Sequence, residues 1–300
     1  MERRIAARCD PHGTIAKVKT IESRYDASAM AYRTWWEPVL APTALDLLDR
    51  HERTAGRPGG RIVDVGTGAG LLAIEAVRRW PAVQVTGLDG SAAMLGVAAA
   101  AARDSLGTPA LRRISWLRGH AERLPFEDET VDLVVSSFAY QLVPRLTAAL
   151  GEAFRVLRPG GRLAFVTWRI ADVRFAPDDA FEDALDELEL GDEPADAEEA
   201  RAGDLTSAGA TARRLRRIGF RSVLAREAWL GYDHDPATYL DFLEGYAERD
   251  LFADIEPDLR ARLREGTTER LARLRPAAFR WRVPVVHALA RRPESIERGP

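Results

Sequence analysis

Short apolar runs alternate with helix-forming stretches along the first half of this 300-residue chain. Their length and composition are typical of buried parallel strands, which we predict at residues 62–65, 83–88, 113–118 and 131–137. Helices are predicted between them, over 71–80 and 91–103. This order of elements is typical of an α/β protein, and 300 residues could hold one such domain with additions or two small domains.

Flanking segments extend the pattern on both sides. Three short helices are expected before the first strand, at residues 21–26, 32–36 and 42–51. A fifth strand is expected after a turn at Pro159-Gly160-Gly161, and Gly219 is expected to end a helix over 208–218. Two further strands are predicted over 220–232 and 279–290, with helices between them.

The most informative segment joins the first strand to the helix that follows it. Residues 61–70 read Arg-Ile-Val-Asp-Val-Gly-Thr-Gly-Ala-Gly, so Gly66, Gly68 and Gly70 bring the backbone close to a ligand. A dinucleotide-binding turn has Gly-x-Gly-x-x-Gly, whereas Leu71 stands where its last glycine would fall. The segment therefore predicts a nucleotide-type pocket that departs from the dinucleotide pattern.

Charge distinguishes the candidate ligands of this turn. Asp64 ends the strand two residues before Gly66. A carboxylate in that place repels a pyrophosphate and attracts a ligand that presents an ammonium or a sulfonium. The sign of the charge favours S-adenosylmethionine over NAD.

A second carboxylate ends the next strand. Asp89 follows the glycines at the distance where an acidic residue holds a ribose diol, because one carboxylate can accept hydrogen bonds from two neighbouring hydroxyls. Ser91 is expected to be the N-cap of the helix that follows.

Five motifs in order resemble those of the class I S-adenosylmethionine-dependent methyltransferases. The resemblance is to the small-molecule branch similar to ubiquinone/menaquinone C-methyltransferases (methyltransferase type 11). The motifs lie within about residues 60–170 and read Val-Asp-Val-Gly-Thr-Gly-Ala-Gly, Leu-Asp-Gly-Ser, Ala-Glu-Arg-Leu-Pro-Phe, Asp-Leu-Val-Val-Ser-Ser and Leu-Arg-Pro-Gly-Gly-Arg-Leu.

The resemblance implies a Rossmann-like, doubly wound α/β fold. Its seven-stranded sheet would be mostly parallel with an antiparallel last strand, and would carry an N-terminal helical lid and helical insertions. The implied divisions are a lid over 1–56, a cofactor-binding core over 57–170, an acidic cap insertion over 171–210, and the C-terminal part of the same sheet, with a helical insertion, over 211–300.

The resemblance also implies which residues hold S-adenosylmethionine. Asp64 would face its amino group, Asp89 its ribose, and Met94 its adenine. The backbone N–H of Ala121 would reach the adenine, and Ser136 would contact the methionine end. The implied cofactor-binding set is Tyr25, Asp64, Gly66, Thr67, Gly68, Gly70, Asp89, Gly90, Ser91, Met94, His120, Ala121, Glu122 and Ser136.

One residue departs from the family pattern. His120 stands where the family usually has an aspartate that bonds the adenine amino group. A neutral imidazole nitrogen can accept that bond and a protonated imidazole cannot, so the sequence predicts a pH-sensitive cofactor affinity. The alternative is a partly exposed loop histidine.

Composition limits the other classes of function. The net charge of −3 gives no general attraction to nucleic acid, and Cys9 is the only cysteine, so no internal disulfide or iron–sulfur site is expected. No zinc-type Cys/His spacing occurs and no metal is expected. With no apolar run of membrane-spanning length and no apolar signal core, a cytoplasmic protein that does not bind membranes is expected, and a homodimer is left open.

Residues 171–205 hold 14 acidic and 2 basic side chains. Phe181, Leu185 and Leu188 recur at helical spacing there, which predicts a helix with one apolar stripe. Its acidic face either steers a cationic substrate or is simply solvated, and we favour the solvated face. Residues 191–203 are expected to form a loop.

The side chains that would meet the methyl acceptor are harder to identify. Trp35, Trp36, Phe138, Tyr140 and Gln141 are candidate substrate-binding residues, while Arg33 is expected on the solvated surface. Methyl transfer needs a base only when the nucleophile must lose a proton early, so the catalytic residues stay unassigned.

Tyr140, Gln141 and His234 are weak candidates for a catalytic role. His234 is flanked by two carboxylates, Asp233 and Asp235, which would raise its pKa if they are near.

Transfer of a methyl group to the O, N or C nucleophile of a small molecule is the leading functional hypothesis. An S-adenosylmethionine-binding regulator or scaffold is the alternative, because binding and turnover share the same motifs. An NAD-dependent oxidoreductase is disfavoured by Asp64 and by the glycine spacing.

Overall fold

The structure of the chain is a computed structural model that describes residues 20–169, 171, 173–190, 205 and 207–294. The chain divides into two compact units. The core unit consists of the described residues of 19–170, 202–230 and 284–300, and the helical unit of those of 171–201 and 231–283. The expected loop over 191–203 lies outside the described residues.

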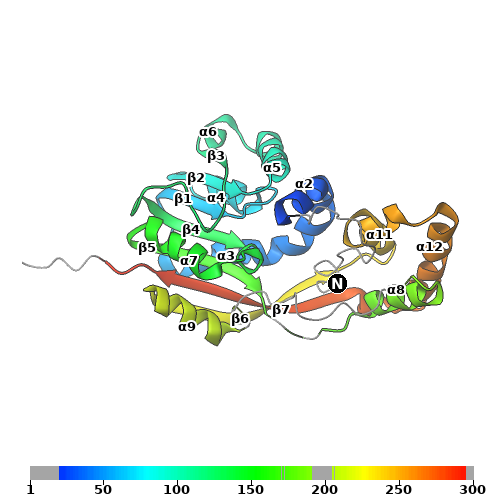
Figure 1. Cartoon of the computed structure of the whole chain (residues 1–300). Coiled ribbons are helices and arrows are strands. Elements are labelled where there is room, and N and C mark those ends of the chain that lie inside the picture. The colour runs from blue at the N-terminus through cyan, green and yellow to red at the C-terminus, as the bar shows by residue number, and fades with distance from the viewer. Residues whose placement is uncertain (1–19, 170, 172, 191–204, 206, 295–300) are drawn as a thin grey trace, which may run out of the picture. The chain divides into compact units, whose positions relative to one another are not determined.

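One seven-stranded sheet has the strand order β3-β2-β1-β4-β5-β7-β6 (Figure 1). Its strands are β1 (Gly60–Val65), β2 (Val83–Asp89), β3 (Ile114–Arg118), β4 (Val131–Ser137), β5 (Leu157–Trp168), β6 (Arg221–Asp233) and β7 (Arg280–Arg291). The strands from β3 to β5 pair in parallel, and β5 pairs antiparallel with β7. The predicted fold class, a mostly parallel doubly wound sheet with an antiparallel end, is confirmed.

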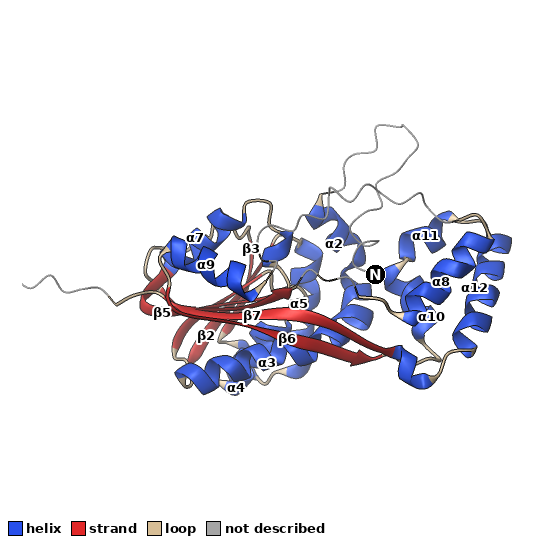
Figure 2. Cartoon of the chain, turned by 90° about the horizontal axis from the view of Figure 1, so that it is seen from below, coloured by secondary structure: helices blue, strands red, loops and turns tan. Residues whose placement is uncertain are grey.

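Helices cover both faces of the sheet in the core unit. Figure 2 shows α7 and α9 on one face and α3 and α4 on the other. The helices and helical turns of this unit are α2 (Ile21–Ala31), η1 (Tyr32–Trp36), α3 (Glu37–Ala55), α4 (Leu71–Arg79), α5 (Ala92–Ser105), α6 (Thr108–Leu111), η2 (Tyr140–Leu142), α7 (Leu146–Val156) and α9 (Ala208–Ile218). Because β1 and β4 are buried on both faces, their sequences are near-continuous apolar runs, as expected of central parallel strands.

The N-terminal helices are longer than the sequence predicts. Instead of three short helices, α2, the π-helical turn η1 and α3 follow one another without a gap. The expected start of the third helix at Pro42 is wrong, because α3 begins at Glu37 and contains Pro42. The carbonyl that Pro42 cannot bond belongs to Pro38, which is exposed, so water can satisfy it.

The expected turn at Pro159-Gly160-Gly161 is also wrong, because all three residues lie within β5. Val131 of β4 pairs with Leu157, whereas Leu133 pairs with Arg162, so β5 bulges there. Gly160 has a φ of 79°, which a residue with a side chain rarely adopts.

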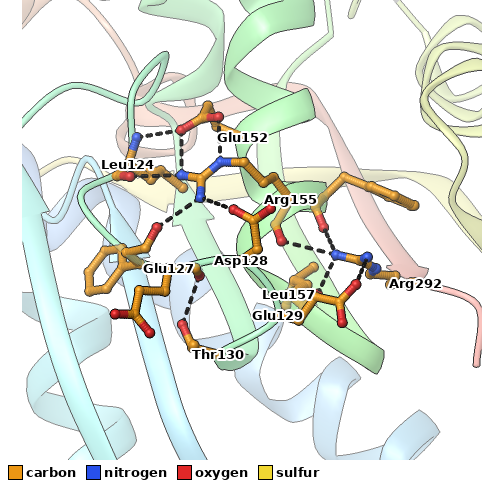
Figure 3. A network of polar contacts seen from close by, with 11 residues as sticks. Leu124, Glu127, Asp128, Glu129, Thr130, Glu152, Arg155, Leu157 and Arg292 are labelled. Carbon is orange, nitrogen blue, oxygen red and sulfur yellow. Dashed lines mark hydrogen bonds and ion pairs between the residues drawn. The ribbon is translucent and has the colours of Figure 1, made fainter. Parts of the chain in front are cut away.

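Two arginines fasten the loop before β4 to the end of α7 (Figure 3). Arg155 donates to Leu124 O at 2.9 Å and to Phe126 O at 2.8 Å, and it pairs with Glu152 and Asp128. Arg292 donates to the carbonyl oxygens at the C-terminal end of α7, including Phe154 O at 2.8 Å. The arginines thus satisfy carbonyl groups that a helix end and a loop leave without backbone partners.

The helical unit has its own core. It contains α8 (Ala176–Glu187), α10 (Tyr239–Phe242), η3 (Leu243–Ala247), α11 (Arg249–Asp254), α12 (Pro257–Ala272) and η4 (Pro276–Phe279). Phe181 and Leu185 of α8 are buried, as the apolar stripe predicts, and Phe181 stacks on Phe252 with ring centroids 6.0 Å apart. The acidic side chains Asp183 and Asp186 are exposed.

A buried histidine lies at the centre of an aromatic cluster in this unit. The ring of His234 is 4.8 Å from Tyr232, 5.1 Å from Tyr239 and 5.1 Å from Phe242, measured between centroids. Its Nε2 has no hydrogen-bond partner among the described residues, and burial lowers its pKa to about 4.

The expectation that the neighbouring carboxylates raise the pKa of His234 is therefore wrong. Asp233 is paired with Arg280 instead, at 2.7 Å, and the Asp235 carboxylate accepts a bond from Ala237 N at 2.9 Å.

None of the helices in the described ranges is both long and apolar enough to cross a membrane.

Replacing Arg155 by methionine is expected to lower the free energy of unfolding by about 2–3 kcal/mol. The variant leaves two loop carbonyls and two carboxylates without their charged donor, and such hydrogen bonds are worth about 1.5–3 kcal/mol. Urea unfolding measures the change, with Arg103→Met, on the exposed side of α5, as the control. Equal stabilities of the two variants would contradict the prediction.

Acid is expected to weaken the fold through His234. The folded protein binds fewer protons than the unfolded chain between a pKa of about 4 and the ordinary 6.5, so stability falls as the pH falls through that window. Between pH 7.5 and pH 5 the native protein should lose about 2 kcal/mol more than His234→Phe. Urea unfolding at both pH values checks this, and parallel pH profiles would speak against it.

Candidate functional site

The glycine turn after β1 is tightly packed on both sides. Gly66, Gly68 and Gly70 have φ values of 68°, 54° and 92°, which favour glycine. A Cβ on Gly66 would lie 2.2 Å from the Cβ of Ala139, and one on Gly70 would lie 2.8 Å from the ring of Trp116. The turn therefore needs glycine at 66 and 70 both for its backbone conformation and for space, and at 68 for its backbone conformation.

Asp64 holds this turn to the helix that follows. Its Oδ2 accepts the Thr67 hydroxyl at 2.6 Å and the Ala73 N–H at 3.2 Å. The residue is 1% exposed, and burial raises its pKa to about 7. Both of these bonds end on Oδ2, which leaves Oδ1 as the oxygen available to a ligand.

Asp89 organises the end of the neighbouring strand. Its two oxygens accept the backbone N–H groups of Gly68 and Ser91, each at 2.9 Å. Burial raises its pKa, and the charge of Asp26 acts in the same direction. Ser91 is the N-cap of α5, as predicted, because its hydroxyl accepts the Met94 N–H at 3.0 Å.

The N-terminal helix α2 brings two further carboxylates to this place. Asp26 accepts the Ser91 hydroxyl at 2.6 Å and the Ala93 N–H at 3.0 Å. Glu22 lies against Gly90, where an added Cβ would be 2.9 Å from the Glu22 Cγ. The sequence analysis missed Asp26 and Glu22, because no motif or periodicity indicates that α2, which is distant in the sequence, packs against the start of α5.

The residues expected around the adenine lie next to α2. His120 is exposed, and its Nδ1 is 3.5 Å from Oε1 of Glu22. Met94 and Ala121 are 1% and 8% exposed. Oε1 of Glu122 is 3.7 Å from Nε of Arg145. The structure thus places His120 beside Gly90, and its role in binding adenine stays a prediction.

The segment after β4 is strained. Phe138 has a φ of 51°, in the left-handed region that favours glycine. Its ring lies 4.2 Å from that of Trp168, measured between centroids. Strain of this kind in a residue that carries a side chain is typical of functional segments.

The other candidates after β4 differ in exposure. Ser136 and Tyr140 are 0% and 1% exposed, and neither hydroxyl has a hydrogen-bond partner in the described part of the chain. Burial, and then the charge of Asp64, raise the pKa of Tyr140. Gln141 is half-buried and accepts the Thr167 hydroxyl at 2.9 Å while it donates to Phe138 O at 2.5 Å.

The segment η1–α3 also reaches the glycine turn. Arg33 donates to Ala69 O at 3.3 Å and pairs with Glu37 at 3.1 Å, so it is more than the solvated surface residue that the sequence suggests. Of the adjacent tryptophans, Trp36 is buried and Trp35 half-buried. Tyr25 packs edge-on against Tyr32, with ring centroids 6.1 Å apart.

A small cavity of about 20 Å³ lies beneath the turn. Its lining comes from η1, α3, β1, α4 and the end of β4, and comprises Tyr32, Glu37, Leu40, Ala44, Asp64, Gly66, Thr67, Leu71, Leu72 and Ser137. Within the described ranges, no group of His, Cys, Asp and Glu side chains is placed to hold a metal ion. The site thus combines a glycine turn with carboxylates at the ends of two adjacent strands.

Comparisons with known proteins place the glycine turn within a known family of domains. The family described as "Methyltransferase domain" matches residues 62–161. Malonyl-[acyl-carrier protein] O-methyltransferase of Methylococcus capsulatus is 35% identical over 155 residues, which is 51% of each protein. The ubiquinone/menaquinone biosynthesis C-methyltransferase UbiE of Dinoroseobacter shibae is 34% identical over 161 residues, or 51% of this chain and 58% of UbiE. The chain spans about half the length of the curated relatives it matches.

A solved structure extends the likeness of the fold beyond the matched segment. The [4+2]-cyclase SpnF superposes with a TM-score of 0.57 at 19% identity, over 94% of this chain and 98% of SpnF. At such low identity the likeness concerns the fold alone. The sequence matches and the motifs they contain show that this chain carries a class I S-adenosylmethionine-dependent methyltransferase domain.

Proposed function

We propose that the chain transfers the methyl group of S-adenosylmethionine to a small-molecule acceptor. The observation that carries the proposal is the glycine turn with a carboxylate at the end of β1 and another at the end of β2. When bound, the cofactor supplies a methyl group on a positively charged sulfur that is already a good leaving group. The protein has to align the acceptor with that methyl and exclude water, which can be worth about 7–11 kcal/mol.

Each carboxylate has a separate task in this proposal. Asp89 accepts hydrogen bonds from the ribose hydroxyls, since each of its oxygens has a lone pair left after the backbone bonds. Oδ1 of Asp64 faces the ammonium group of the methionine part, directly or through a water. His120 accepts a bond from the adenine amino group when its imidazole is neutral.

The acceptor side is proposed to lie at the ends of β4 and β5. The paired rings of Phe138 and Trp168 would form an apolar wall, and the amide of Gln141, fixed by Thr167, would fix polar groups of the acceptor. The names of the relatives include both an O- and a C-methyltransferase. An acceptor screen should therefore cover phenols, carboxylates, amines and carbon nucleophiles, with labelled methyl as the readout.

A second candidate function is cofactor binding without methyl transfer. It is favoured by the glycine turn and the two strand-end carboxylates, because these parts of the site would serve binding and turnover alike. Binding of S-adenosylmethionine with no labelled product from any acceptor would support this alternative.

Calorimetric titration tests the cofactor assignment. S-adenosylmethionine and S-adenosylhomocysteine are expected to bind and NADH is not. Asp89→Asn keeps the shape of the side chain but removes one acceptor, so it should weaken S-adenosylmethionine binding by about 1–3 kcal/mol. Asp104→Asn, an exposed residue of α5, is the matched control. An unchanged isotherm for Asp89→Asn would refute the ribose role.

The affinity for S-adenosylmethionine is expected to depend on pH through Asp64. Its pKa of about 7 means that acid adds a proton, and a neutral carboxyl group does not balance the ammonium charge. Binding should be about tenfold weaker at pH 6 than at pH 8, since one proton must leave. Titrations of Asp64→Asn test this cause. The variant should bind weakly with a flatter pH profile, and an unaltered profile would exclude Asp64.

A further inference from the structure

The small cavity beneath the glycine turn contains a second carboxylate that belongs to no motif. Glu37 is the first residue of α3 and is 8% exposed. It lines the same cavity of about 20 Å³ as Asp64. Since glutamate is rarely buried in proteins unless it is paired, its place there calls for a positively charged partner.

Arg33 supplies only part of that partner. The Arg33 guanidinium is 3.1 Å from Oε1 of Glu37, but its side chain is 36% exposed and it also donates to Ala69 O. Burial raises the pKa of Glu37 above its ordinary value despite this pair. The carboxyl group is thus held in surroundings that Arg33 alone does not fully compensate.

The size and lining of the cavity restrict what can enter it. A volume of about 20 Å³ is that of one water-sized group, and an ammonium group is of that size. Asp64, Glu37 and Thr67 offer oxygen atoms, while Leu40, Leu71 and Leu72 exclude further water. An ammonium group in so small a cavity would lie close to both Glu37 and Asp64.

We propose that Glu37 and Asp64 together form the subsite for the ammonium group of the cofactor's amino-acid end. The inference rests on the proposed function and deepens it. The N-terminal segment η1–α3 would then take part in recognising the donor by its charge. Asp64 contacts the subsite from the β1 side of the cavity, and Glu37 would contact it from the α3 side.

The charges around the subsite are compatible with this assignment. In the described part of the chain, the charged or titratable groups near it include Arg33 and Tyr32 of η1, Glu37 of α3, Asp64 of β1 and Asp89 of β2. The buried hydroxyl of Tyr140 is also near, since the charge of Asp64 acts on it. With one cation and several carboxylates, this group of residues favours a positively charged ligand.

Three ligands distinguish the ammonium group from the sulfonium. S-adenosylmethionine carries both, S-adenosylhomocysteine carries only the ammonium, and methylthioadenosine carries neither. Glu37→Gln should bind the first two about tenfold less tightly than the native protein, because a charged hydrogen bond is lost. Its affinity for methylthioadenosine should equal that of the native protein. Glu52→Gln, on the same helix but not in the cavity lining, is the matched control and should leave all three affinities unchanged.

The other outcomes of these titrations would overturn the inference. An unchanged affinity of Glu37→Gln for S-adenosylmethionine would do so, as would a loss for S-adenosylmethionine but not for S-adenosylhomocysteine. Equal weakening of methylthioadenosine would mean a structural role for Glu37. If the native protein bound no S-adenosylmethionine, the proposed function would fail together with the inference, whereas the other outcomes leave that function intact.

Discussion

The hydrogen bonds that Asp64 Oδ2 accepts from Thr67 and Ala73 hold the site together. They tie the end of the central strand to the glycine turn and to the first residues of α4. The positive φ values at 66, 68 and 70 favour glycine, and Ala139 and Trp116 occupy the space where side chains at 66 and 70 would point. The same carboxylate is buried enough to titrate near neutral pH, so it connects the stability of the turn with the charge of the ligand.

Acidic residues from the N-terminal helices complete what the strand ends begin. Asp26 and Glu22 of α2 lie at the beginning of α5 and at Gly90, and Glu37 of α3 lines the cavity beneath the turn. A negative side chain at a helix N-terminus is favourable, which explains Asp26 at the start of α5. Each of these residues puts negative charge around a site whose proposed ligand carries a net positive charge.

The helical unit owes its stability to a different kind of core. Its buried rings surround His234, whose Nε2 has no partner in the described residues, and α8 packs on α12 through an apolar stripe. The carboxylates next to His234 in the sequence have other partners. The prediction that they raise the pKa of His234 was wrong because it relied on proximity along the chain. Asp233 is the last residue of β6 and is exposed, whereas His234, the next residue, is buried.

Local chemistry was enough to identify the central strands, the glycine turn, the end of β2 at Asp89 and the cap at Ser91. Each depends on residues within a few positions of one another, where apolar runs, backbone freedom and capping act directly. The continuous N-terminal helix, the bulge at Gly160 and the place of Glu37 depend on contacts between distant segments. Only the tertiary structure decided them, because packing between distant segments, and not local propensity, determines where a helix continues, where a strand bulges and which site a buried charge faces.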